Sequence, residues 1–178
     1  IADTETPQGI IAVCEMRSKR LDDFLASGKM LLVLDRVTDP GNIGTMLRTA
    51  DAAGVGGLLL LQGCADIYAP KTVRASMGSL FHLPVLSGLS EELLVQAARK
   101  AGYELLVTCL DGADNLYKAD LQGRLAFVMG NEANGVSPAL LAAADKRVFI
   151  PMQGRAESLN VAMAAGIVMF EALRQKLK

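Results

Sequence analysis

Short, fully apolar runs separated by helical segments are the feature that most constrains the fold of this 178-residue chain. Three such runs are "MLLVL" (30–34), "GLLLL" (57–61) and "LAFVM" (125–129). A strand that is apolar on both faces is typical of a parallel sheet covered by helices on each side. The alternation of these runs with helical segments therefore predicts an α/β domain with a mainly parallel sheet flanked by helices.

Local patterns and helix-breaking residues predict the remaining elements. Further strands are expected at residues 9–14, 83–86, 104–108 and 148–150. Helices are expected at residues 21–26, 43–53, 71–80, 91–101, 138–144 and 158–177. Gly54 and Gly102 are typical helix C-terminal stops for two of them. Residues 9–178 are thus predicted to form one domain, and the polar residues 1–8 a linker from a preceding part of a longer protein.

The composition restricts how the chain could bind nucleic acid. Aromatic residues make up 4% of the sequence and tryptophan is absent, so base stacking on an aromatic surface is not expected. The formal net charge of -1 differs from the strongly basic character of a self-sufficient nucleic-acid-binding domain. If the substrate is RNA, positive charge must be concentrated locally or come from another domain or subunit.

Cysteine and histidine are too few and too scattered for a metal site. Cys14, Cys64 and Cys109 have no paired spacing, and His82 is the only histidine, so neither a zinc site nor a disulfide framework is expected. This cysteine usage predicts a protein of the reducing cytoplasm. No apolar stretch is long enough to span a bilayer, so no membrane association is expected.

Three turns have unusual chemistry, at residues 38–44, 130–135 and 150–160. In a parallel sheet, ligands bind at the carboxyl ends of the strands, where such turns converge. The turn "GNEANG" does not fit a dinucleotide-binding loop, because Glu132 stands where the second glycine belongs. The Gly-Lys-Ser or Gly-Lys-Thr of a P-loop is absent, and no credible Ser–His–Asp set exists. These three classes of site are excluded.

The same turns lie within three longer motifs. In chain order, "DRVTDPGNIGTMLRTADAAG" (35–54), "FVMGNEANGVS" (127–137) and "IPMQGRAESLNVAMAAGI" (150–167) resemble the three signature motifs of the SpoU/TrmH family. The segment "KTVRASMGSLFHLPV" (71–85) resembles the family's sequence between the first two motifs. The resemblance covers residues 9–173, and three long motifs in the correct order are a specific signal.

The resemblance implies a fold and an activity. Family members are S-adenosylmethionine-dependent RNA ribose 2′-O-methyltransferases of the SPOUT superfamily, acting on rRNA or tRNA as homodimers. Their C-terminal part forms a deep trefoil knot, an exception to the rule that chains do not knot. Many carry an N-terminal RNA-binding domain, so we expect this chain to bind the cofactor but to bind RNA poorly. Two alternatives remain: a SPOUT enzyme that methylates a base nitrogen, or a non-catalytic RNA-binding or assembly factor with the same fold.

The resemblance also assigns residues to the cofactor. Gly130, Ile150 and Leu159 match positions that line it in the family, where backbone groups would meet the adenine edge and the two apolar side chains would cover its faces. Further candidates are Thr108, Asn131, Met152 and Ser158. The alternative is that the glycine only forms a turn and the apolar residues only form core.

Catalytic candidates come from the same comparison. Asn42 and Arg48 match the motif-one asparagine and the catalytic arginine, and the helix that follows the loop is expected to turn the guanidinium toward it. We expect Arg48 to hold a substrate phosphate and stabilise the developing alkoxide, with the proton passing to phosphate or water, because arginine stays charged near neutral pH. Glu132 would orient the loop or the substrate, or cap backbone donors. Ser158 and Asn160 would fix ribose and cofactor, or cap the last helix.

Contacts to RNA are expected from Arg48 and from the segment between the first two motifs. There, Lys71, Arg74 and His82 could contact phosphates, or could be ordinary surface charges. The last helix carries a different signal, because residues 159–170 ("LNVAMAAGIVMF") are apolar nearly all round. A helix without a polar face is buried on every side. We therefore expect a homodimer formed through this C-terminal helix, with burial inside a monomer as the alternative.

Overall fold

A seven-stranded parallel sheet forms the centre of the molecule, with the strand order β3-β2-β1-β6-β4-β7-β5. The structure is a computed structural model that describes residues 9–10, 12–15, 19–110 and 112–177. The strands are β1 (Leu31–Leu34), β2 (Gly57–Leu61), β3 (Val85–Leu89), β4 (Glu104–Thr108), β5 (Asp114–Asn115), β6 (Leu125–Met129) and β7 (Lys146–Phe149). The predicted α/β class with a parallel sheet is confirmed, and the trefoil knot stays a prediction.

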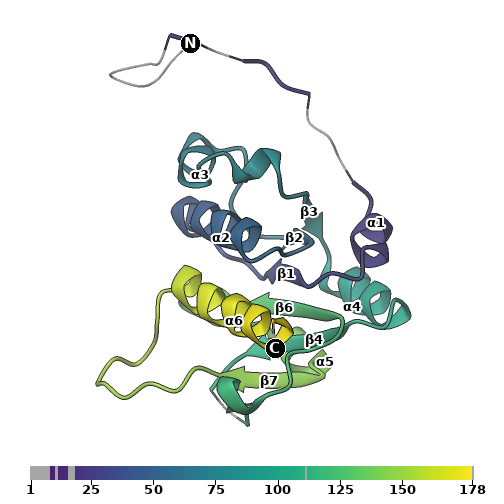
Figure 1. Ribbon diagram of the computed structural model, residues 1–178, viewed down its shortest axis with the longest axis vertical. Coiled ribbons are helices and arrows are strands. Elements are labelled where there is room, and N and C mark those ends of the chain that lie inside the picture. Colours follow the sequence, from purple (N-terminus) through teal and green to yellow (C-terminus); the bar gives the residue numbers. More distant parts are fainter. Residues whose placement is uncertain (1–8, 11, 16–18, 111, 178) are drawn as a thin grey trace.

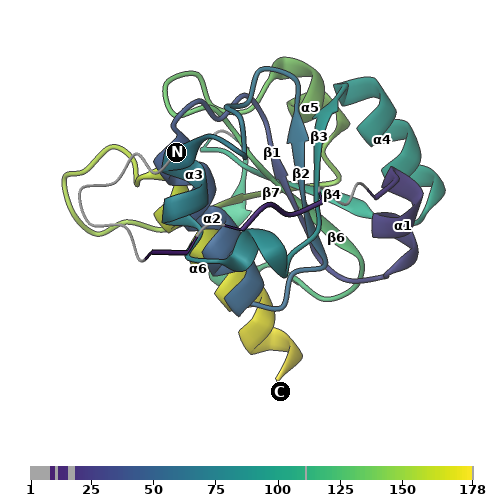
Figure 2. The same ribbon diagram turned by 90° about the horizontal axis from the view of Figure 1, so that it is seen from above.

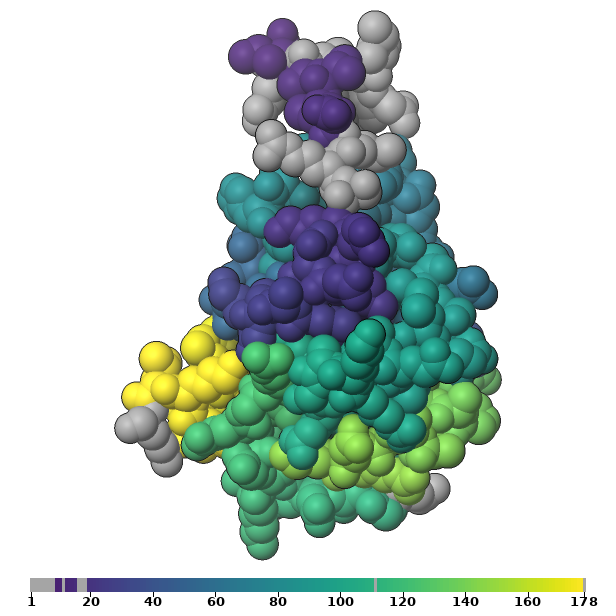
Figure 3. Space-filling view, turned by 90° about the vertical axis from the view of Figure 1, so that its right-hand side faces the viewer, coloured from purple at the N-terminus to yellow at the C-terminus, as the bar shows by residue number. Residues whose placement is uncertain are grey.

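Helices cover both faces of the sheet (Figures 1 and 2). On one face lie α1 (Leu21–Ala26), α4 (Glu91–Lys100) and α5 (Pro138–Ala143), which Figure 3 shows side by side. On the other lie α2 (Pro40–Ala52) and α6 (Val161–Lys176), with α3 (Pro70–Ala75) packed on α2. The two layers explain the continuous apolar runs, because successive residues of each strand enter opposite cores.

Strand β1 shows this alternation. Leu31 and Val33 pack into the core beneath α1, α4 and α5. Leu32 and Leu34 pack into the core beneath α2 and α6. All four side chains are fully buried. A polar residue at any of these positions would be buried without a partner, so the run is apolar throughout.

The strand predicted at residues 9–14 is wrong. Its described residues lie outside the sheet, and Ile10 and Val13 are 86% and 101% exposed. An apolar run forms a strand only where a neighbouring strand can pair with it. Residue 11 and the predicted linker at residues 1–8 lie outside the described residues.

The helix predicted at residues 71–80 is interrupted. Helix α3 ends at Ala75, and Met77 and Gly78 then adopt positive φ values of 49° and 92°. A short 3-10 helix, η1 (Ser79–Phe81), follows. Two elements were not predicted at all, β5 and the 3-10 helix η2 (Leu116–Lys118). No helix in the described part of the chain has the length and hydrophobicity that crossing a bilayer requires.

Candidate active site

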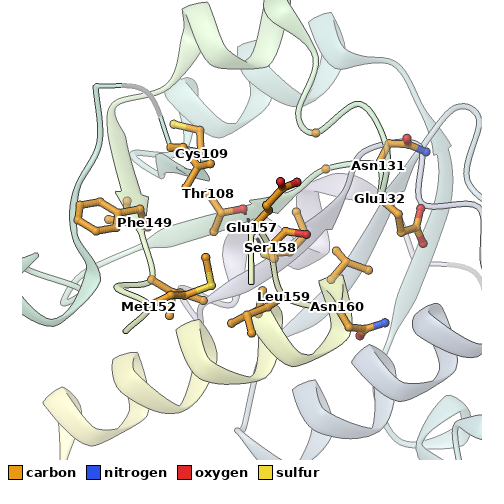
Figure 4. A pocket seen from close by; sticks show the side chains of 18 residues that line it. Thr108, Cys109, Asn131, Glu132, Phe149, Met152, Glu157, Ser158, Leu159 and Asn160 are labelled. Carbon is orange, nitrogen blue, oxygen red and sulfur yellow. Dashed lines mark hydrogen bonds between the residues drawn. The ribbon is translucent and has the colours of Figure 1, made fainter. Parts of the chain in front are cut away.

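A cavity of about 460 Å³ opens at the carboxyl ends of β4, β6 and β7, beside the start of α6 (Figure 4). This volume lies within the range of small-molecule sites. The cavity is lined by Thr108, Cys109, Leu110, Met129, Gly130, Asn131, Glu132, Gly135, Val148, Phe149, Ile150, Met152, Glu157, Ser158, Leu159, Asn160, Val161 and Ala164. Residues from the second and third motifs therefore meet in one place.

All seven residues assigned to the cofactor from the sequence line this cavity. Phe149 and Met152 lie toward one end of it, and Glu132 and Asn160 toward the other (Figure 4). Thr108 ends β4, and its hydroxyl donates to the Val128 carbonyl oxygen at 3.3 Å. The cavity thus combines an apolar end with a polar end that contains a carboxylate, and contact with a cofactor stays a prediction.

Gly130 is required by the shape of its loop. A Cβ at this position would overlap the backbone of Gly135 and Val136. The approach is close because Asn131 and Gly135 exchange two backbone hydrogen bonds, at 3.0 and 2.9 Å. The Asn131 side chain is also committed to the loop, since its Oδ1 accepts from the backbone N–H groups of Ala133 and Asn134. For these two residues the structure supports a turn-forming role.

Asn42 is positioned by the cap of α2. Asp39 is the N-cap residue, and its Oδ1 accepts from the backbone N–H groups of Gly41 at 2.6 Å and Asn42 at 3.0 Å. Pro40 occupies the first helical turn, where its fixed φ is already suited to a helix. Helix α2 therefore begins three residues before the predicted boundary, and Asn42 lies in its first turn.

A chain of side-chain hydrogen bonds joins the three motifs. Asn42 Nδ2 donates to Glu132 Oε1 at 2.9 Å, and Asn160 Nδ2 donates to Asn42 Oδ1 at 3.0 Å. Burial raises the pKa of Glu132, but the bond from Asn42 and those from the Thr38 and Asp39 backbone outweigh it, so the pKa is lowered overall. Glu132 is thus bonded to the first motif through Asn42, and its role in orienting the loop or the substrate stays a prediction.

Asn160 caps α6. Its Oδ1 accepts from the backbone N–H groups of Ala162 at 2.9 Å and Met163 at 3.3 Å, while its Nδ2 reaches Asn42. The capping role considered from the sequence is thus observed for Asn160. Ser158 lies two residues before the cap, is exposed and lines the cavity. The last helix begins at Val161, three residues after the predicted start.

Arg48 is exposed on α2 and is not among the residues that line the cavity. At about 100° per residue, six positions place it about 120° around the helix from Asn42. The direction of its guanidinium relative to the loop stays a prediction. Within the described residues, the Arg48 side chain has no hydrogen-bond or ion-pair partner, so its donors are available to a ligand.

The residues considered for RNA contact lie on α3 and just after η1. Lys71 Nζ is 3.3 Å from Asp39 Oδ2, which places it beside the first-motif loop. The pKa of Asp39 is lowered, first by the backbone N–H of Asn42 and then by Lys71. Arg74 is exposed, and His82 Nδ1 lies 3.2 Å from Asp51 Oδ2. Of these three candidates, Lys71 is the one that contacts the first-motif loop.

Several residues that build the site were not predicted from the sequence. Cys109, Phe149 and Glu157 line the cavity. Cys109 and Phe149 could have been selected because they lie at or beside strand ends, and Glu157 because it lies within the third motif. Asp35 and Arg36 contact the second-motif loop, and their signal was their place at the start of the first motif. No group of histidine, cysteine or acidic side chains suited to a metal ion was found in the described ranges.

Comparison with known proteins identifies the family. The profile of the SpoU rRNA Methylase family matches residues 29–170. The chain belongs to this family. Among family relatives, it is 40% identical over 170 residues to the 23S rRNA (guanosine(2553)-2'-O)-methyltransferase RlmP of Bacillus subtilis, a match that covers 96% of this chain and 66% of that protein.

Solved structures of family members have the same fold. The AdoMet-bound rRNA methyltransferase from Sinorhizobium meliloti superposes with a TM-score of 0.84 at 38% identity, covering 92% of this chain and 63% of that one. The SpoU methyltransferase AviRb from Streptomyces viridochromogenes, in complex with AdoMet, gives a TM-score of 0.83 at 39% identity, covering 92% and 67%. The chain spans about two thirds of the length of these relatives.

Proposed function

We propose that this chain is the catalytic part of an S-adenosylmethionine-dependent methyltransferase that modifies a ribose 2′-hydroxyl of ribosomal RNA. The observation that carries the proposal is the hydrogen-bonded chain Glu132–Asn42–Asn160, which joins all three motifs at the cavity. Relatives at 34–41% identity are named 23S rRNA 2'-O-methyltransferases, with guanosine or uridine as the nucleoside. These names support the substrate class.

The residues of the cavity fit S-adenosylmethionine. The cavity volume of about 460 Å³ suits a cofactor of this size, and the apolar side chains of Ile150 and Leu159 can cover an adenine ring. The cofactor carries positive charge on its sulfonium and its amino group, and Glu132 and Glu157 supply carboxylates in the cavity lining. When bound, the cofactor supplies an electrophilic methyl group.

The residues of the chain would act mainly by positioning. The network of Asn42, Glu132 and Asn160 holds the loops of the three motifs in one arrangement. Because the loops are already ordered, less conformational entropy is lost when the reactants bind. Arg48 has unused donors and stays charged, so it would bind a phosphate of the substrate RNA and stabilise the negative charge that develops on the 2′-oxygen. The proton of the 2′-hydroxyl would pass to phosphate or water.

The proposal includes a homodimer formed through α6. On this helix Met163 and Phe170 are 61% and 47% exposed, and Ile167 between them is half-buried. Residues at these spacings share one helical face. An apolar face of this kind is suited to a second copy of the same helix. We place the enzyme in the cytoplasm, where rRNA is modified.

A preceding RNA-binding domain would supply most of the affinity for RNA. The chain has a net charge of -1 and spans about two thirds of its relatives. Residues 1–8 would then be the linker to that domain, and residues 9–178 would hold the cofactor.

Two measurements test the proposal. Isothermal titration calorimetry with S-adenosylmethionine should show binding to the chain alone, and absence of binding would favour the non-catalytic alternative. Incubation of a high concentration of the chain with 23S rRNA and labelled cofactor, followed by nucleoside mass spectrometry, should yield a 2′-O-methylated nucleoside. A base-methylated nucleoside would instead support the base-nitrogen alternative.

A further inference from the structure

Two residues outside the predicted site connect the loops that build it. Asp35 and Arg36 directly follow β1. The Asp35 side chain is 0% exposed, and its two oxygens accept from Arg36 Nε at 2.8 Å and Nη2 at 3.0 Å. A buried carboxylate requires such a hydrogen-bonded partner, and a two-pronged guanidinium fixes the geometry of the pair.

The pair holds both ends of the second-motif loop, residues 131–137. Asp35 Oδ2 accepts from the backbone N–H of Ser137 at 2.7 Å. The Arg36 carbonyl oxygen accepts from Asn131 Nδ2 at 2.8 Å, and Arg36 Nη2 reaches the Gly135 carbonyl oxygen at 3.5 Å. Two consecutive residues of the first motif are therefore bonded to the beginning and the end of one loop.

The backbone at Arg36 is adapted to this role. Its φ is 54°, a left-handed conformation that is unfavourable for a residue with a side chain. In this conformation the carbonyl group reaches Asn131 while the guanidinium turns back to Asp35. A conformation of this kind persists only where its surroundings hold it, and such residues concentrate at functional sites.

The loop held by the pair forms one wall of the cavity, through Asn131, Glu132 and Gly135, together with Gly130 directly before it. Asp35 and Arg36 do not themselves line the cavity. We propose that Asp35 and Arg36 are positioning residues that hold this loop in the shape that binds the methyl donor. That the loop binds a methyl donor depends on the proposed function. That Asp35 and Arg36 restrain the loop does not depend on it.

The test uses two variants and a matched control. Arg36→Gly removes the guanidinium while allowing the positive φ, and Asp35→Asn keeps the size of the buried side chain and an acceptor for Ser137. The control is Met77→Gly, because Met77 also has a positive φ, of 49°, but is 71% exposed and is not part of the cavity. Arg36→Gly removes the guanidinium contacts to Asp35 and to the Gly135 carbonyl oxygen. Asp35→Asn weakens the contacts to Arg36 and Ser137, because it removes the negative charge. Met77→Gly changes none of these contacts.

Two quantities are measured well below the thermal midpoint of each variant. Calorimetry gives the dissociation constant for S-adenosylmethionine, and hydrogen exchange gives the protection of the Gly135 and Ser137 amides. We expect the dissociation constant to rise about tenfold or more in Arg36→Gly and by a smaller factor in Asp35→Asn. Exchange at Gly135 should accelerate most in Arg36→Gly, because Arg36 contacts Gly135. Exchange at Ser137 should accelerate most in Asp35→Asn, because a neutral amide oxygen is a weaker acceptor than the carboxylate. Met77→Gly should match the wild type.

The outcomes separate the inference from the proposed function. Wild-type affinity and protection in both Arg36→Gly and Asp35→Asn would overturn the inference and leave the proposed function intact. Equal weakening in Met77→Gly would show a general loss of stability and would also overturn it. If the wild type does not bind S-adenosylmethionine, the proposed function fails, and the exchange of Gly135 and Ser137 still decides whether the pair restrains the loop. If Arg36→Gly does not fold, Asp35→Asn against Met77→Gly gives the decision.

Discussion

Replacing Gly130 by alanine is predicted to damage both stability and the cavity. The added Cβ would overlap the carbonyl group of Gly135 and the nitrogen of Val136. These are backbone atoms, so no side-chain rotation can relieve the overlap. Room can be made only by separating residues 130–131 from residues 135–136, which strains or breaks the two backbone hydrogen bonds between Asn131 and Gly135.

The expected magnitude follows from these contacts. Loss of two backbone hydrogen bonds costs about 2 kcal/mol, and overpacking of a tight site costs about 1–3 kcal/mol. Since separating the strands of the loop relieves the overlap at the expense of the bonds, the two costs are alternatives. We expect the free energy of unfolding to fall by about 2–3 kcal/mol. The dissociation constant for S-adenosylmethionine should rise about tenfold or more, since the displaced residues line the cavity.

Gly154→Ala is the matched control. Gly154 lies in the third-motif loop, has no positive φ, and a Cβ there would meet nothing within 4 Å. Its replacement should change the free energy of unfolding by less than about 0.5 kcal/mol. Urea unfolding followed by circular dichroism and calorimetric titration of the cofactor measure both effects. If Gly130→Ala is as stable as Gly154→Ala and binds the cofactor as tightly, then an added Cβ at residue 130 does not displace the backbone of residues 135–136.

Three further predictions concern charge, catalysis and assembly. Glu132→Gln should lower the thermal midpoint at neutral pH, because the folded protein stabilises the Glu132 carboxylate and so lowers its pKa below the ordinary value of 4.5. The difference in midpoint from the wild type should therefore vanish as the pH falls below 4.5 and through the folded-state pKa. A difference that stays constant with pH would contradict this. Arg48→Ala should reduce methyl transfer about 100-fold with unchanged cofactor affinity, since Arg48 does not line the cavity, and wild-type transfer would contradict its role. Met163→Asp should convert a dimer to a monomer in light scattering, and a monomeric wild type would contradict the proposed dimer.

Strands buried on both faces were predictable from the sequence. The bounds of β2, β4 and β6 agree with the prediction, because each is a five-residue run whose side chains mostly enter the two cores. The short strand β5 was missed because its two residues, Asp114 and Asn115, are polar and lie at the sheet edge. The apolar run at residues 9–14 was mistaken for a strand because local pattern does not reveal whether a partner is available.

The candidate site was predictable in its membership but not in its connections. The motif resemblance selected seven residues that line one cavity and three, Asn42, Glu132 and Asn160, that are hydrogen-bonded in series. It did not select Asp35 and Arg36, because their bonds to Ser137 and Asn131 span large separations in the chain. Nor could it place Arg48, whose direction depends on which face of α2 packs against the sheet.

The pairing of β1 with β6 has a consequence for how the protein is made. Leu31 lies opposite Ala126, so one of the central contacts of the sheet joins early and late parts of the chain. A chain growing on the ribosome can pair β1 with β2 but exposes the other edge of β1 until β6 emerges. Unpaired strand edges template association with other chains. Synthesis of this protein therefore passes through an aggregation-prone interval, which ends only when the second half of the sheet is complete.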